Sequence, residues 1–119
     1  MKILIVDDDH GCREMLHAHL NRNHELSMLT NGRNALALLA DDDHDFDLVL
    51  LDLNMPRLNG TKLIEVLSEW DNLKVRFIVV SGVPNIEHIS KLPNVIAVLT
   101  KPFQLTALDT LLNRIPTLA

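Results

Sequence analysis

The stretch Ile3-Leu4-Ile5-Val6, followed at once by Asp7-Asp8-Asp9, decides the fold of this 119-residue chain. Four consecutive apolar residues that stop at charged ones are typical of a strand buried on both faces, and such strands belong to parallel sheets. Apolar residues then recur at helical spacing, at Cys12, Met15, Leu16 and Leu20. A strand followed by an amphipathic helix is therefore the first predicted unit.

The same unit repeats along the rest of the chain. Apolar runs predict further strands at 26–29, 48–52, 75–80 and 95–99. Apolar spacing predicts helices at 35–39, 61–70 and 105–115, and a short one fits between Pro84 and Pro93. Five strands alternating with five helices predict a doubly wound α/β fold, in which helices cover both faces of a parallel sheet. One domain over residues 1–119 accounts for the whole sequence.

Composition excludes several classes of function. The chain has 11 Lys and Arg against 16 Asp and Glu, a net charge of -5, and no basic run. Direct binding to nucleic acid or to an anionic membrane is therefore not expected. Cys12 is the single cysteine, so the chain forms no internal disulfide, and no apolar run approaches the ~20 residues of a membrane span. These features lead us to expect a cytoplasmic protein.

Residues whose side chains can bind ligands or take part in reactions follow the predicted strands. The first strand ends in Asp7-Asp8-Asp9, the third in Asp52, the fourth in Ser81 and the fifth in Lys101. In doubly wound sheets the carboxyl ends of the strands meet at one edge, where ligands bind. Carboxylates crowded there need a cation between them, and a ligand set made only of oxygens favours Mg²⁺. With an ammonium and a hydroxyl nearby, the pattern predicts a phosphoryl-transfer site.

Four motifs, in this order, carry a resemblance to a known family. They are residues 3–9, Leu51-Asp52-Leu53-Asn54-Met55-Pro56 with Gly60 after it, Val79-Val80-Ser81, and Thr100-Lys101-Pro102-Phe103. Over essentially its whole length the chain resembles the receiver domain of bacterial two-component response regulators. The resemblance implies the flavodoxin-like fold of the CheY-like superfamily, with strand order 2-1-3-4-5.

The resemblance also implies a signalling phosphoacceptor, not a conventional enzyme. Asp52 would take a phosphoryl group from a phosphohistidine on a sensor histidine kinase or a histidine phosphotransfer protein. Lys101 and Ser81 would contact the phosphoryl oxygens, and the conformational change would regulate an output domain or an effector protein, either separate or fused in a longer chain. We expect the neighbouring metal and lysine to lower the pKa of Asp52.

The metal implied by the resemblance is Mg²⁺, with Mn²⁺ as the alternative. Its ligands would be Asp7, Asp8, Asp52 and the backbone carbonyl of Asn54. Asp9 matches the acid that commonly follows the pair, and we do not count it as a ligand.

The chain departs from the family pattern three positions before the lysine. Val98 stands there in place of the usual aromatic residue, and the chain has no tyrosine. A pseudo-receiver that binds partners without being phosphorylated therefore stays open as an alternative. A second alternative is a haloacid-dehalogenase-type phosphatase with Asp7 as nucleophile and Asp9 as acid-base, although this hypothesis leaves Asp52 unexplained.

The remaining polar and aromatic features are interpreted as structural. We expect residues 41–47, which are rich in aspartate, to form a solvated loop and not a cation site. His10 is expected at the surface at the start of the first helix, and Cys12 is expected to pack. Trp70 is expected at the edge of the core.

Overall fold

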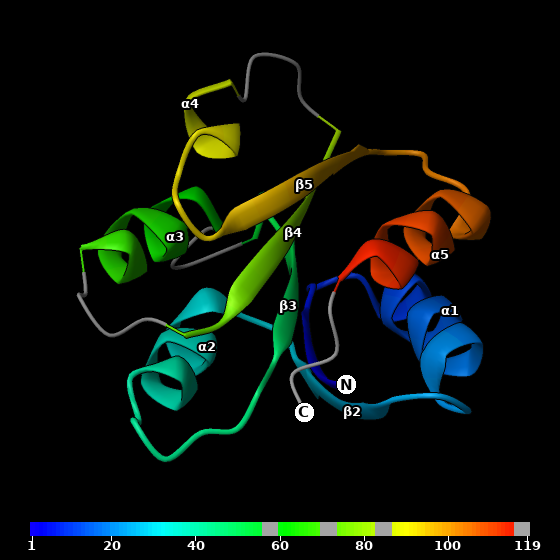
Figure 1. The fold of residues 1–119 in the computed structure, drawn as a ribbon, viewed down its shortest axis with the longest axis horizontal. Coiled ribbons are helices and arrows are strands. Elements are labelled where there is room, and N and C mark those ends of the chain that lie inside the picture. The colour runs from blue at the N-terminus through cyan, green and yellow to red at the C-terminus, as the bar shows by residue number, and fades with distance from the viewer. Residues whose placement is uncertain (56–59, 70–73, 83–86, 116–119) are drawn as a thin grey trace.

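The computed structural model describes residues 1–55, 60–69, 74–82 and 87–115. Its strands are β1 (Lys2–Val6), β2 (Glu25–Leu29), β3 (Leu48–Asp52), β4 (Arg76–Ser81) and β5 (Val95–Thr100). Its helices are α1 (His10–Leu20), α2 (Gly32–Leu39), α3 (Gly60–Ser68), α4 (Glu87–Ser90) and α5 (Leu105–Arg114). All the strand pairs are parallel and the sheet order is β2-β1-β3-β4-β5, which confirms the predicted doubly wound fold (Figure 1).

Helices cover the sheet on both faces, with α1 and α5 on one side and α2, α3 and α4 on the other (Figure 1). Alternate residues of each central strand point to opposite faces. In β1, Ile3 and Ile5 pack with residues of α1 and α5, whereas Leu4 and Val6 pack with residues of α2, α3 and α4. The unbroken apolar run at the start of the sequence therefore supplies both halves of the core.

The first helix differs from its predicted form at one residue. It begins at His10, as predicted, because the Asp9 side chain caps its N-terminus. Met15 is 40% exposed, so its predicted place on the buried stripe is wrong. Leu16 and Leu20 lie one above the other and are buried, whereas Met15 is rotated from that line by the ~100° of one residue.

The other helices agree with the predicted pattern at their cores. The short α4 lies between the two prolines as predicted. The helix predicted at 61–70 is α3, which begins at Gly60 and ends at Ser68, two residues before its predicted end. Trp70 lies outside the described residues, and its predicted place at the edge of the core stays a prediction. Within the described segments, no helix is long and apolar enough to cross a membrane.

The amino edge of the sheet is joined to the loop between α2 and β3. The Lys2 backbone N–H donates to Asp47 Oδ2 at 2.8 Å, and the Asp47 N–H donates to the Lys2 carbonyl at 2.9 Å. The Lys2 ammonium forms an ion pair with Asp45 and lies 4.9 Å from the centre of the Phe46 ring. Residues 41, 42, 43 and 45 of this loop are exposed, which confirms the predicted solvated loop.

Candidate functional site

The predicted site residues meet at the carboxyl edge of the sheet. Asp7 follows β1, Asp52 ends β3, Ser81 ends β4 and Lys101 follows β5. Asp7, Asp52 and Ser81 are 3%, 4% and 1% exposed, and no other polar side chain in the described ranges is buried. The core therefore continues up to the site, and these three polar groups lie at its end.

Three carboxylates form the one group in the described part of the chain with the spacing of a metal site. An oxygen from each of Asp7, Asp8 and Asp52 lies within 4.8 Å of the others. Asp8 is exposed while its two partners are buried, so the group opens to solvent on one side. Hard carboxylate oxygens with room for water ligands fit a cation such as Mg²⁺.

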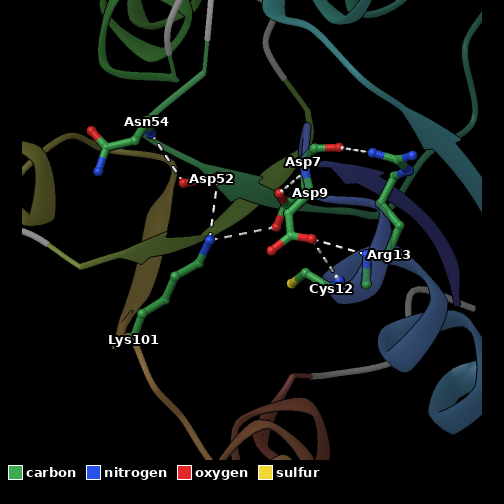
Figure 2. A network of polar contacts seen from close by, with 8 residues as sticks. Asp7, Asp9, Cys12, Arg13, Asp52, Asn54 and Lys101 are labelled. Carbon is green, nitrogen blue, oxygen red and sulfur yellow. Dashed lines mark hydrogen bonds and ion pairs between the residues drawn. The ribbon is translucent and has the colours of Figure 1, made fainter.

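Lys101 bridges the two buried carboxylates. Figure 2 shows its side chain reaching from the end of β5, with Nζ 3.3 Å from Asp52 Oδ2 and 3.7 Å from Asp7 Oδ2. Burial lowers the pKa of Lys101, but the charges of Asp7 and Asp52 outweigh this effect and raise the pKa above its usual value. The ammonium therefore stays charged at neutral pH. The peptide bond between Lys101 and Pro102 is cis.

The pKa of Asp52 is raised, so the expected lowering is wrong for the protein side chains taken by themselves. Burial raises this pKa most, and the charge of Asp7 raises it further. The Asn54 backbone N–H and the Lys101 ammonium lower it, without reversing the shift. Two carboxylates share one ammonium here, so negative charge is in excess. A divalent cation would lower the pKa again.

Both oxygens of the Asp52 carboxylate have a partner from the protein. Oδ1 accepts a hydrogen bond from the Asn54 backbone N–H at 3.0 Å, and Oδ2 faces the Lys101 ammonium (Figure 2). Since the Asn54 side chain is exposed, this residue meets Asp52 through its backbone. The carboxylate is therefore held in one orientation at the end of β3.

Gly60 packs directly behind Asp52. A Cβ atom at Gly60 would lie 2.4 Å from the Asp52 carbonyl oxygen and 2.7 Å from the Leu53 Cα atom. The Gly60 N–H also donates to the Leu53 carbonyl at 3.1 Å. Only glycine fits this approach of the start of α3 to the end of β3, which gives a physical reason for the glycine that follows the Asp52 motif.

Asp9 supports the site without joining the carboxylate group. Its backbone N–H donates to Asp7 Oδ1 at 2.8 Å, and its own carboxylate accepts from the N–H groups of Gly11 at 2.9 Å and Cys12 at 3.4 Å. Asp9 is thus the N-cap of α1. This agrees with its exclusion from the predicted ligands.

Cys12 packs next to the site as a neutral side chain. Burial, followed by the neighbouring Asp7 carboxylate, raises the pKa of its thiol to about 12. Its side chain contacts the core cluster on the α1 and α5 face. The prediction that Cys12 packs is confirmed, and the thiol stays protonated at neutral pH.

Arg13 is a contact of the site that the sequence did not reveal. Its Nη1 atom donates to the Asp7 backbone carbonyl at 2.8 Å, and Nη2 lies 3.4 Å from His10 Nδ1. The apolar residues at helical spacing, Cys12, Met15, Leu16 and Leu20, do not include Arg13. The available signal was its place in the first turns of the helix, from which a long side chain can reach back to the strand end. His10 itself is exposed, as predicted.

Comparisons with known proteins agree with this geometry. A sequence profile of the family described as the response regulator receiver domain matches residues 3–113. The response regulator MprA of Mycolicibacterium vanbaalenii is 40% identical over 77 residues, which cover 63% of this chain and 32% of that protein. The segments matched in the curated relatives span between 11% and 32% of those proteins' lengths.

Solved structures show the same fold. The receiver domain of the Francisella response regulator 1452 has a TM-score of 0.81 and 27% identity, covering 94% of this chain and 93% of that one. The response regulator TrrA of Thermotoga maritima, solved in complex with Mg²⁺-BeF, has a TM-score of 0.79 and 23% identity, with 95% and 96% covered. Because the family profile spans nearly the whole chain, this protein belongs to the response regulator receiver domain family of two-component signalling.

Proposed function

We propose that this receiver domain accepts a phosphoryl group on Asp52 in a reaction that depends on Mg²⁺. The observation that carries the proposal is that three features meet at one carboxylate. Asp52 is buried at the end of β3, faces Lys101 at 3.3 Å and shares the cation-spaced group with Asp7 and Asp8. Asp8 lacks this combination because it is exposed. Asp7 is buried in the same group but lies farther from the Lys101 ammonium, at 3.7 Å, and of the two only Asp52 accepts a hydrogen bond from it.

The donor that fits is a phosphohistidine on a sensor histidine kinase or a histidine phosphotransfer protein. An oxygen of Asp52 attacks phosphorus, the O–P bond forms as the N–P bond breaks, and the donor imidazole leaves with the electron pair and takes a proton. Lys101 lies where the charge of the transferred group develops, and the hydroxyl of Ser81 lies at the neighbouring strand end. The product is an acyl phosphate on Asp52.

The residues that would hold Mg²⁺ are Asp7, Asp8, Asp52 and the backbone carbonyl of Asn54. The oxygen donors and their spacing fit this ion, with Mn²⁺ as a substitute. A bound divalent cation would offset the excess negative charge of the carboxylates and stabilise the charge on the phosphoryl oxygens.

The proposed output is a conformational change at the ends of β4 and β5. Phosphorylation adds negative charge beside Lys101, whose backbone N–H already donates to the Ser81 carbonyl at 2.8 Å. Val98 in β5 packs against the core on the α2, α3 and α4 face. The switch would therefore have the aliphatic Val98 side chain in place of the usual aromatic residue, and would act on an output domain or an effector protein.

The two alternative functions are not favoured. In a phosphatase of the haloacid dehalogenase type, Asp9 would act as acid-base, but its carboxylate here caps α1. A pseudo-receiver would not need the complete set of site residues found at this edge of the sheet. Membership in the receiver family favours neither alternative.

Intact-mass spectrometry tests the proposal directly. The protein is incubated with Mg²⁺ and acetyl phosphate, beside Asp52→Asn, an exposed-site control Asp45→Asn, and a sample with chelator. We expect a base-labile gain of one phosphoryl group in the wild type and in Asp45→Asn, and no gain in the other two. An adduct that persists in Asp52→Asn would move the acceptor elsewhere. A folded wild type that gains nothing would favour the pseudo-receiver.

A further inference from the structure

The peptide that joins Asp7 to Asp8 lies just beyond the end of β1. The Asp7 N–H still donates to the Leu29 carbonyl of β2 at 3.1 Å, as a last bond of the sheet. The Asp7 carbonyl instead accepts from Nη1 of Arg13 at 2.8 Å. The Asp7 carbonyl is therefore hydrogen-bonded to a side chain of α1 instead of to the sheet.

The backbone of Arg13 is hydrogen-bonded to the same segment between β1 and α1 that its side chain contacts. Its backbone N–H donates to the Asp9 carbonyl at 3.1 Å, and the Asp9 N–H donates to Asp7 Oδ1 at 2.8 Å. The strand end, the helix cap and the guanidinium thus form a closed ring of hydrogen bonds around Asp7 (Figure 2). Such a ring limits how the backbone between β1 and α1 can rotate.

Asp8 depends on this backbone more than its partners do. Asp7 and Asp52 are buried and have hydrogen bonds or ion pairs, whereas Asp8 is exposed. Among the described residues, no hydrogen bond or ion pair holds the Asp8 carboxylate. The place of its Cα–Cβ bond therefore depends on the orientation of the peptide that precedes it, which is the peptide that Arg13 holds.

We propose that Arg13 is a positioning residue for the cation site: by holding the Asp7 carbonyl, it sets the place of Asp8 relative to Asp7 and Asp52 and so increases the affinity for a divalent cation. This inference rests on the proposed function, because it needs the three carboxylates to bind a metal. It concerns a residue that need not touch the cation.

Because Arg13 is positively charged, the direction in which cation affinity changes when it is removed tests the inference. A guanidinium near a cation site that acts only through its charge repels the cation, so its removal would strengthen binding. A guanidinium that acts by holding the backbone has the opposite effect, and its removal weakens binding. Loss of a residue that orients a metal ligand typically lowers affinity by about 10-fold or more.

The test measures Mn²⁺ binding by electron paramagnetic resonance, in which the signal of the free aqueous ion falls as the protein binds it. The variants are Arg13→Ala, Arg13→Gln and Arg13→Lys, with Arg22→Ala as the control. Arg22 is exposed just beyond the end of α1, so its removal makes the same change in charge away from the site. We expect about 10-fold weaker binding in Arg13→Ala and Arg13→Gln, partial recovery in Arg13→Lys, and wild-type binding in Arg22→Ala.

Unchanged or tighter binding in Arg13→Gln would overturn the inference while leaving the proposed function intact. A wild type that binds no Mn²⁺ would instead remove the metal site itself. Thermal unfolding without metal identifies any variant that is not folded, and Arg13→Lys, which keeps the long side chain, then decides. The phosphorylation rate adds a second readout: the Mg²⁺ concentration for half-maximal rate should rise in Arg13→Gln, while the rate at saturating Mg²⁺ returns to the wild-type value.

Discussion

The two edges of the sheet treat charge in opposite ways. At the amino edge, Lys2 and Asp47 exchange two backbone-linked hydrogen bonds, and the Lys2 ammonium pairs with the exposed Asp45. At the carboxyl edge, the buried carboxylates of Asp7 and Asp52 share one ammonium. The ion pair at the first edge is in contact with water, whereas the two carboxylates at the second edge are buried.

This difference indicates which edge is built for a ligand. Burying like charges together costs folding free energy, and such an arrangement persists where it serves function. The exposed pair at the amino edge has no such cost, because both of its side chains remain in contact with water. A cation that binds at the carboxyl edge relieves this repulsion, and the relief adds to its binding free energy.

The largest expected effect comes from changing Gly60 to alanine. The added Cβ would lie 2.4 Å from the Asp52 carbonyl, so the start of α3 or the end of β3 has to move. We expect a loss of about 3 kcal/mol in the free energy of unfolding, and slower phosphorylation, because Asp52 shifts. Urea denaturation and the phosphorylation assay measure the two effects.

The matched control for Gly60→Ala is Gly11→Ala. Gly11 lies in α1, and a Cβ there would meet Asp9 Oδ1 at an ordinary 3.4 Å. This change should stabilise the protein by about 0.5 to 1 kcal/mol, because alanine favours helix. Equal stability of the two variants would show that the approach behind Asp52 is not tight.

The second prediction removes charge from the carboxyl edge. Without metal, Asp52→Asn should raise the free energy of unfolding at neutral pH, by the order of 1 kcal/mol, since it removes a buried charge beside Asp7. Mg²⁺ should then stabilise the variant less than the wild type. Thermal unfolding with and without Mg²⁺ measures both. A variant less stable than the wild type without metal would mean that the Lys101 pair outweighs the repulsion.

The pH dependence of this effect has a definite sign. The folded-state pKa of Asp52 is raised above 3.8, so the folded protein binds the proton more tightly than the unfolded chain does. The contribution of Asp52 to stability is therefore lost as pH rises from about that value through the raised pKa. The advantage of Asp52→Asn should grow over the same interval and then level off, which unfolding curves at several pH values can follow.

The sequence predicted the fold and the members of the site because both follow from local patterns. The apolar runs that end in Asp7 and Asp52 identify central strands and place their last residues at one edge. This inference needs only the rule that parallel strands share a carboxyl edge. The apolar runs and the residues that end them therefore carried most of the information.

Features that depend on three-dimensional packing were not predictable in this way. The raised pKa of Asp52 results from burial together with the nearby Asp7, which no spacing reveals. The contact of Arg13 with a backbone carbonyl depends on the rotation of α1, and the exposure of Met15 does as well. The sequence shows Gly60 only as part of a motif, and its close approach to Asp52 follows only from the three-dimensional structure.

The third prediction concerns the cap that joins the site to α1. Asp9→Ala removes the acceptor for two N–H groups of the helix and should cost about 1 kcal/mol of unfolding free energy. Asp9→Asn, which retains a capping oxygen, should recover most of this loss. The backbone N–H that donates to Asp7 remains in both variants, so Mn²⁺ affinity should change little. A large loss of affinity in both would assign Asp9 to the metal ligands.

The smallest expected effect lies at the amino edge. Asp45→Ala breaks the ion pair with Lys2, in which Asp45 raises the pKa of Lys2 and Lys2 lowers the pKa of Asp45. Both groups are solvated, so the urea midpoint should stay within the error of the measurement. Salt offers an independent check, because added NaCl screens exposed pairs and leaves buried groups nearly unaffected. A drop in the midpoint of Asp45→Ala that disappears in high salt would show that the amino edge contributes real stability, and the contrast between the two edges would then rest on the buried carboxylates alone.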